Sequence, residues 1–178
     1  MVPPGPSVVH LRLVQPVSVD PAGVRPVLEE GAQEWLGSPV EAPAKVPGSR
    51  RFLTDLSLPV RGHAPKMVFR KAAYVDLGPV RDLPDGLEVA IGWRSSTLAP
   101  LFPVFAGTLA VTPRELRLEG YYAPPGGEVG LVLDKAFLNI AARGTARWLL
   151  AEVSAALQGA RRDGHAPPPA VDSEAPGR

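Results

Sequence analysis

The residues of this chain that could do chemistry are tyrosines, arginines, aspartates and tryptophans. The sequence contains no cysteine. Disulfides, thiolate nucleophiles and thiolate metal sites are therefore excluded. The three histidines, His10, His63 and His165, lie too far apart in the sequence for any local metal-ligand spacing. His165 also falls in a tail rich in proline and glycine, so we do not expect it to be catalytic.

Six aromatic residues are the candidate ligand contacts. Five fall in apolar phases that would point at one groove, where their faces could sandwich a planar molecule, and the sixth, Tyr74, could present its phenol to the same cavity. The six are Tyr74, Trp93, Phe105, Tyr122, Phe137 and Trp148. Each of them could instead only pack a helix against a sheet. The phenols of Tyr74 and Tyr122 could orient a ligand carbonyl or hydroxyl, or could satisfy a nearby backbone group.

Few charged residues offer a chemical role. Arg70 shares a strand phase with Tyr74, so its guanidinium either is buried and needs an anionic partner or is solvated on the surface. Asp134 lies near the start of the last predicted helix, where capping is expected rather than general-base chemistry. Asp55 and Asp76 lie in or beside strands with no histidine near in sequence, so both are predicted to be surface residues.

Motifs for phosphate binding or nucleophilic attack are missing. Gly126, Gly127 and Gly130 precede a helix, but no Gly-Lys-Ser/Thr follows and no Rossmann spacing exists. Ser95 and Ser96 lack the glycine-flanked turn of a nucleophile elbow. The sequence therefore predicts no catalytic residue, no metal site and no cofactor.

The composition is that of one globular domain. The chain has 178 residues, and its 19 Lys and Arg nearly cancel 18 Asp and Glu, which gives no electrostatic reason to bind nucleic acid. It has no basic leader and no apolar run of about 18 residues, so we expect a cytoplasmic protein with no membrane span. We expect the domain to cover residues 8–158, between disordered tails 1–7 and 159–178.

The hydrophobic pattern predicts six strands and two helices. The predicted strands are 8–19, 52–60, 66–76, 87–93, 102–111 and 116–122, with Pro16 limiting the first to a sheet edge or a bulge. In 66–76 both phases are apolar, so the pattern does not show which face is interior. A helix is predicted over 24–36, starting at about Arg25 because of Pro26 and ending at Gly37. Residues 37–50 read as a long loop.

The last predicted helix, over residues 128–158, is apolar on most sides. Its polar residues Lys135, Asn139, Arg143 and Arg147 recur at four-residue steps and form one solvent stripe. So wide an apolar surface must be largely enclosed, and only the sheet can enclose it. The sequence therefore predicts an α+β fold, with a curved antiparallel sheet of about six strands gripping a long C-terminal helix and one short helix after the first strand.

This order of elements resembles the helix-grip fold of the START-like (SRPBCC) superfamily, which includes polyketide cyclases, aromatases and pollen-allergen-like proteins. A more specific resemblance lies in Leu101-Phe102-Pro103, Gly107, Leu116 to Tyr122, Pro124-Pro125, Gly130 and Asp134. This stretch is similar to the end of bacterial, chiefly actinobacterial, START-like proteins of unassigned activity. The first helix is short, and no second helix is visible in 37–50, where the superfamily usually has one.

The resemblance implies a cavity between sheet and helix that holds a hydrophobic small molecule. We consider three functions, of which the first two use this cavity. The first is binding or carriage of a small apolar ligand without catalysis. The second is a cyclase- or aromatase-like enzyme, in which polar groups such as Tyr74, Arg70 or Tyr122 steer proton transfer. The third is a protein-interaction domain that uses the outer face or an edge of the sheet.

Overall fold

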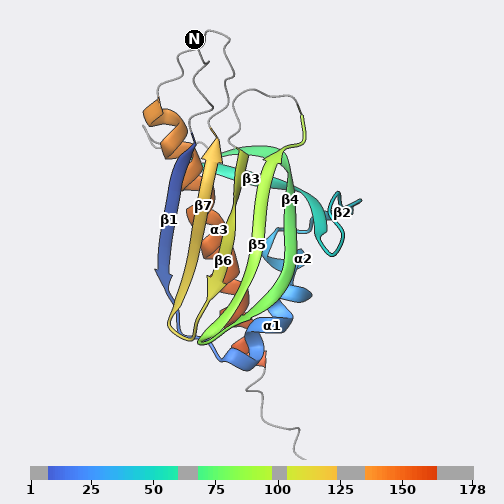
Figure 1. Ribbon diagram of the computed structural model, residues 1–178, viewed down its shortest axis with the longest axis vertical. Coiled ribbons are helices and arrows are strands. Elements are labelled where there is room, and N and C mark those ends of the chain that lie inside the picture. The colour runs from blue at the N-terminus through green and yellow to red at the C-terminus, as the bar shows by residue number, and fades with distance from the viewer. Residues whose placement is uncertain (1–7, 60–67, 98–103, 124–134, 164–178) are drawn as a thin grey trace, which may run out of the picture.

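A seven-stranded antiparallel sheet forms the body of the protein (Figure 1). The computed structural model describes residues 8–59, 68–97, 104–123 and 135–163. In spatial order the strands are β1 (Val9–Pro16), β7 (Glu115–Ala123), β6 (Val104–Val111), β5 (Gly86–Ser95), β4 (Val68–Leu83), β3 (Arg50–Pro59) and β2 (Val40–Ala42). The sheet curves around a long helix, α3 (Lys135–Asp163), which confirms the predicted helix-grip arrangement.

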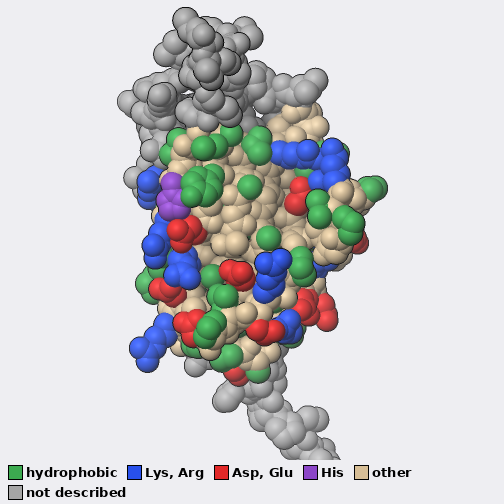
Figure 2. Space-filling model, viewed as in Figure 1, with side chains coloured by type: hydrophobic (Ala, Val, Ile, Leu, Met, Phe, Trp, Pro, Cys, Tyr) green, Lys and Arg blue, Asp and Glu red, His purple; other side chains and the backbone are tan. Residues whose placement is uncertain are grey.

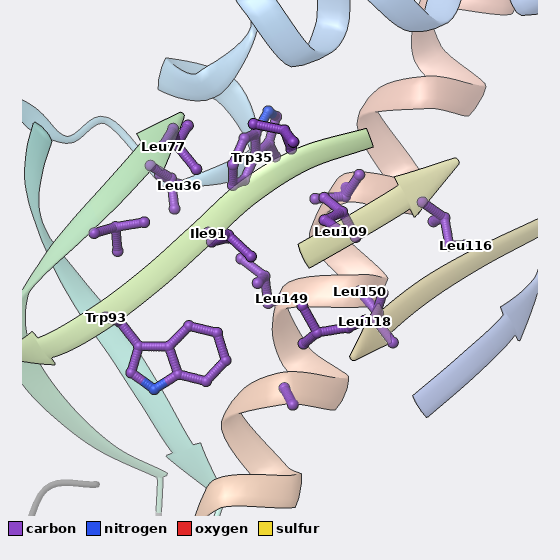
Figure 3. Close-up of a cluster of buried hydrophobic side chains, with 14 of the residues drawn as sticks. Trp35, Leu36, Leu77, Ile91, Trp93, Leu109, Leu116, Leu118, Leu149 and Leu150 are labelled. Atoms are coloured by element: carbon purple, nitrogen blue, oxygen red, sulfur yellow. The ribbon is translucent and has the colours of Figure 1, made fainter. Parts of the chain in front are cut away.

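One face of the sheet, called the interior face below, is covered by helices. Figure 2 shows the opposite, outer face, which carries both acidic and basic side chains. Two shorter helices, α1 (Pro21–Glu29) and α2 (Ala32–Trp35), lie beside α3 on this side, and α3 contacts β1, β3 and β7 as well as both short helices. Alternate strand residues such as Val75, Ile91 and Leu109 are buried there, opposite Leu149 and Leu150 of α3 (Figure 3). The core is therefore a single layer of apolar side chains between sheet and helices.

The predicted helix over 24–36 is two helices. The first begins at Pro21, earlier than the predicted Arg25, because Asp20 caps it by accepting a hydrogen bond from the Ala22 amide, 3.1 Å away. Pro26 lies inside α1, which corrects the expectation that it must stand in the first turn. The chain turns at Gly31, where an added Cβ would come within 3.1 Å of Val27 Cα. The α1 and α2 pair thus supplies the second helix that the sequence pattern hid.

The sheet has seven strands rather than six, because residues 37–50 are not only a loop. Strand β2 pairs there with β3 through Val40 and Leu53. Gly37 does end the preceding helix, with φ 73°. Strand β1 forms the other edge of the sheet and ends at Pro16. This confirms the prediction that Pro16 limits the first strand to an edge or a bulge.

Strand β4 continues to Leu83, seven residues beyond its predicted end at Asp76. An irregularity between Leu77 and Val80 bends it, and a short turn at Pro84 and Asp85 leads into β5. The ambiguous phase is settled, because Ala73, Val75 and Leu77 are buried on the interior face. Among the helices that the structure describes, none is long and apolar enough to cross a membrane.

Two polar side chains of β3 fasten the short helices to the sheet. Thr54 donates to the carbonyl oxygen of Leu36, just after α2, over 2.6 Å. Arg50 donates to the carbonyl oxygens of Leu28 and Glu29 at the end of α1, where a cation also complements the helix dipole. These bonds hold α1 and α2 against the part of the interior face that α3 does not cover.

Candidate ligand-binding site

Three of the predicted aromatic residues form a row across the interior face. Trp93 pairs with Phe105 across β5 and β6, and Phe105 pairs with Tyr122 across β6 and β7. Their side chains are 2%, 2% and 3% exposed, respectively. Residues directly opposite on neighbouring strands share a face, so these three rings line one band of the concave surface. We call them the aromatic row.

The Phe105 ring stacks on the Trp93 ring and lies over two glycines. The Trp93 and Phe105 rings stack, with centroids 4.1 Å apart and planes 18° from parallel. Gly107 and Gly120 face each other on β6 and β7, and the Phe105 ring tip would lie 2.8 Å from a Cβ added at either. The two glycines therefore form a shallow hollow in the sheet that the Phe105 ring occupies.

The aromatic row carries two polar groups. The indole Nε1 of Trp93 is buried and has no hydrogen-bond partner among the described residues, and Figure 3 shows it pointing away from the labelled side chains of the core. Burial raises the pKa of the Tyr122 phenol, an effect that the charge of Arg143 on α3 partly offsets. Near neutral pH the row therefore offers a neutral phenol and an N–H donor that has no partner among the described residues.

Helix α3 contributes to this region from the other side. Trp148 is partly buried and packs against the core cluster. Arg143 and Arg147 are exposed, as the predicted solvent stripe requires. Phe137 lies in the first turn of α3, but its side chain is outside the described residues, so its predicted ligand contact stays a prediction.

Tyr74 is not part of the row, which corrects the expectation that it faces the groove. It lies on the outer face of β4, because Ala73 and Val75 on either side of it occupy the interior phase. There its ring lies between two guanidinium groups, with Arg51 Cζ 5.5 Å and Arg94 Cζ 5.7 Å from the ring centroid. Tyr74 therefore does not reach the interior face of the sheet.

Arg51 and Asp76 form an ion pair on the same outer face that sequence reasoning missed. Arg51 Nε and Nη2 donate to the two carboxylate oxygens of Asp76 over 2.6 and 2.9 Å, and the Arg51 side chain is only 7% exposed. The hydrogen bond to Asp76 also raises the pKa of Arg51. No local signal could show this pair, because its members face each other across β3 and β4.

The remaining candidates are scattered. The Asp55 side chain is exposed, as predicted. His10 is half exposed, 3.2 Å from a carboxylate oxygen of Glu119 and in ring contact with Tyr121. The Arg70 side chain and all of Asp134 lie outside the described residues. In the part of the chain that the structure describes, no three acidic, histidine or cysteine side chains are grouped closely enough to hold a metal ion.

Comparisons by sequence find nothing similar: no protein-family model matches the chain, and no curated protein does.

Comparisons by structure find aromatase/cyclases. The Zhui aromatase/cyclase from Streptomyces sp. R1128 is 16% identical, with a TM-score of 0.55 over 90% of this chain and 98% of that one. The di-domain ARO/CYC StfQ from the steffimycin biosynthetic pathway is 18% identical, with a TM-score of 0.55 over 88% of this chain. The di-domain ARO/CYC BexL is 13% identical, with a TM-score of 0.52 over 90% of this chain.

The chain spans about half the length of each di-domain protein, 52% of StfQ and 51% of BexL. At these identities the likeness concerns the backbone and not the side chains of the site. This chain therefore has the helix-grip fold that these three aromatase/cyclases also have.

Proposed function

We propose that this protein, a START-like protein of the bacterial type described above, binds a hydrophobic small molecule between the sheet and α3. The ligand would lie against the aromatic row. The observation that carries the proposal is the Trp93 indole N–H, which is buried in an apolar interior with no partner among the described residues. A buried donor left unpaired costs about 1–3 kcal/mol, and a ligand acceptor would remove that cost.

The row also favours one kind of ligand. Stacked rings complement a planar apolar molecule. An acceptor on the rim of that molecule, such as a carbonyl oxygen, would meet the Trp93 N–H. We therefore expect an aromatic or polycyclic ligand with at least one carbonyl or hydroxyl group, and few charges, because a charge would lose its hydration in this interior.

Native mass spectrometry of protein purified from its own host tests the binding itself. We expect a co-purifying apolar molecule, released on denaturation, at up to one per chain. A stoichiometric partner chain without a small molecule would contradict the proposal and favour the protein-interaction alternative.

A matched pair of probes tests the role of Trp93. Acetylnaphthalene carries a carbonyl, and ethylnaphthalene has nearly the same shape without it. We expect Trp93→Phe to weaken acetylnaphthalene binding about two- to tenfold more than ethylnaphthalene binding, as the loss of one hydrogen bond predicts. Trp148→Phe is the control and should leave the ratio of the two affinities unchanged. An equal loss for both probes in Trp93→Phe would refute the hydrogen bond.

An aromatase- or cyclase-like reaction is the second candidate, and Tyr122 favours it. Its phenol is buried in the row, and the raised pKa keeps it protonated. A neutral phenol could donate a hydrogen bond to a carbonyl oxygen on which negative charge develops during ring closure. Three structural neighbours are named as aromatase/cyclases, which is consistent with this chemistry.

The experiment for this candidate offers a linear poly-β-ketone and follows ring formation. Tyr122→Phe should lower the rate while leaving acetylnaphthalene affinity within about twofold, because the ring stays and only the hydroxyl is lost. A wild-type protein that binds the naphthalene probes but closes no ring would leave carriage as the function.

A further inference from the structure

A second hollow lies at the opposite end of β5 from Trp93. It opens where the start of α1 meets the β4–β5 turn and the turn that joins β6 to β7, and its volume is about 570 Å³. Pockets of about 300–1,000 Å³ hold drug-sized molecules. The aromatic row ends far from it, since Gly86 opens β5 and Trp93 lies near its close. This hollow is therefore separate from the site proposed above, and we call it the turn pocket.

The walls of the turn pocket are mainly apolar and stiff. Its apolar lining includes Pro21, Pro84, Pro113, Val24, Leu87 and Val111. The prolines fix φ in all three converging segments, so the walls are preorganised. Val24 and Val111 are buried core residues, which anchor the pocket to the body of the domain. An apolar body of modest size would find matching surface here.

The hydrogen-bond donors at the pocket are already engaged. Pro21 has no N–H, the Ala22 amide donates to Asp20 Oδ1, and the Gly23 amide donates to the Asp20 carbonyl oxygen over 3.0 Å. The start of α1 therefore offers little to an anion, although helix N-termini often bind one. Arg25 donates through one terminal nitrogen to Glu29 over 2.9 Å and through the other to Asp82 over 2.6 Å.

The acceptors, by contrast, are in excess. Two carboxylates, Asp82 and Asp85, line the pocket against the single guanidinium of Arg25. Asp82 receives Arg25 through Oδ1. Asp85 takes part in no ion pair or side-chain hydrogen bond among the described residues. Thr112 is bound locally, since its Oγ1 accepts from the Glu115 amide at 3.1 Å. The two carboxylates are exposed, and with one guanidinium beside them they leave the lining of the pocket with a net negative charge.

We propose that the turn pocket binds a small organic cation, an ammonium group on an apolar body, as a second ligand site. The apolar body packs on the proline and valine walls, and the ammonium group donates to Asp85 and to the free oxygen of Asp82. The argument uses none of the residues of the aromatic row, so it stands or falls separately from the proposed function.

An NMR titration with three probes of similar shape tests the charge requirement. Phenethylamine carries the ammonium group, phenethyl alcohol is neutral and hydrocinnamate is an anion. We expect phenethylamine alone to shift the amide signals of Ala22, Gly86 and Leu87 in a saturable way, with weaker binding at high salt. Binding of the alcohol or the anion with equal affinity would overturn the proposal, as would shifts confined to residues around Trp93.

Asp85→Asn tests the carboxylate while it preserves the shape of the side chain. We expect phenethylamine affinity to fall about two- to fivefold, the range for an exposed charge pair. Asp55→Asn removes an equally exposed charge from β3 and serves as the matched control, with unchanged affinity expected. Equal affinity in wild-type protein and Asp85→Asn would overturn the assignment of this group.

Discussion

Replacing Gly107 with alanine tests the packing on which the aromatic row depends. A Cβ at this position would contact the Glu119 carbonyl oxygen, and it would lie 2.7 Å from Gly120 Cα and 2.8 Å from the Phe105 ring tip. Ordinary van der Waals contact begins at about 3.4 Å. Two of these three neighbours are backbone atoms of β7, so the conflict cannot be relieved by turning one side chain.

The expected cost follows from that geometry. Forcing an extra methyl into a packed interior typically costs about 1–3 kcal/mol. Gly→Ala also restricts the unfolded chain, which returns about 0.4–1 kcal/mol where the native backbone suits alanine. Because the added Cβ meets backbone atoms, the cost lies in the upper part of that range, about 2–3 kcal/mol. After the return, we expect Gly107→Ala to lose about 1–2.6 kcal/mol of unfolding free energy, and the midpoint to fall by roughly 2–10 °C for a domain of this size.

Thermal and urea unfolding measure this loss, with Gly23→Ala as the matched control. Gly23 lies inside α1, where an added Cβ has nothing within 4 Å, so alanine should stabilise the helix by about 0.5–1 kcal/mol. Near-ultraviolet circular dichroism should also change in Gly107→Ala, because the Phe105 and Trp93 rings must move. A Gly107→Ala protein as stable as wild type would refute the close packing of Phe105 over the two glycines.

Two further predictions concern single polar groups. Asp76→Asn should cost about 1–3 kcal/mol in urea unfolding, because it leaves the buried Arg51 guanidinium without its anion, whereas a cost as small as that of Asp55→Asn would show that Arg51 is solvated. The raised pKa of Tyr122 predicts that alkali destabilises the protein. Below pH 10, the ordinary phenol pKa, the phenol is protonated in both the folded and the unfolded protein, and its contribution to the unfolding free energy is constant. As pH rises from there toward the folded pKa, the unfolded chain releases the proton first and stability falls. Tyr122→Phe should reduce the pH dependence of the unfolding free energy between pH 9 and 11. Tyr121→Phe, which removes an exposed phenol, should leave this dependence unchanged.

The period-two pattern predicted the strands and the interior phase of Trp93, Phe105 and Tyr122. Trp93 and Tyr122 lie in strands with one clearly polar phase, so solvation alone decides which side faces the core. Phe105 lies in a strand that is apolar on both faces, and it shares their side because it pairs with both across the sheet. The long apolar circumference of α3 likewise required a sheet to enclose it. Local sequence was enough to predict the buried face wherever one face of a strand or helix is solvent-exposed and the other is buried.

Where both faces are apolar, local sequence could not decide. Tyr74 lies in such a strand, and its outward direction is fixed by neighbours distant in the sequence, Arg51 on β3 and Arg94 on β5. Strand β2 has only three residues, which is too short for a period to be visible. The turn pocket was hidden because three segments that are far apart in the chain, the start of α1 and two strand-connecting turns, meet there.

The pairing of β1 with β7 has a consequence for how the protein is made. Val9 pairs with Tyr122 across β1 and β7, so β1, which is made before the other described strands, must wait for β7 before it finds its place in the sheet. Such distant pairing closes slowly, and the unpaired first strand is meanwhile open to other chains. Newly synthesised chains should therefore be most prone to misassembly before the seventh strand emerges, and slowing translation after that point should improve the yield of folded protein.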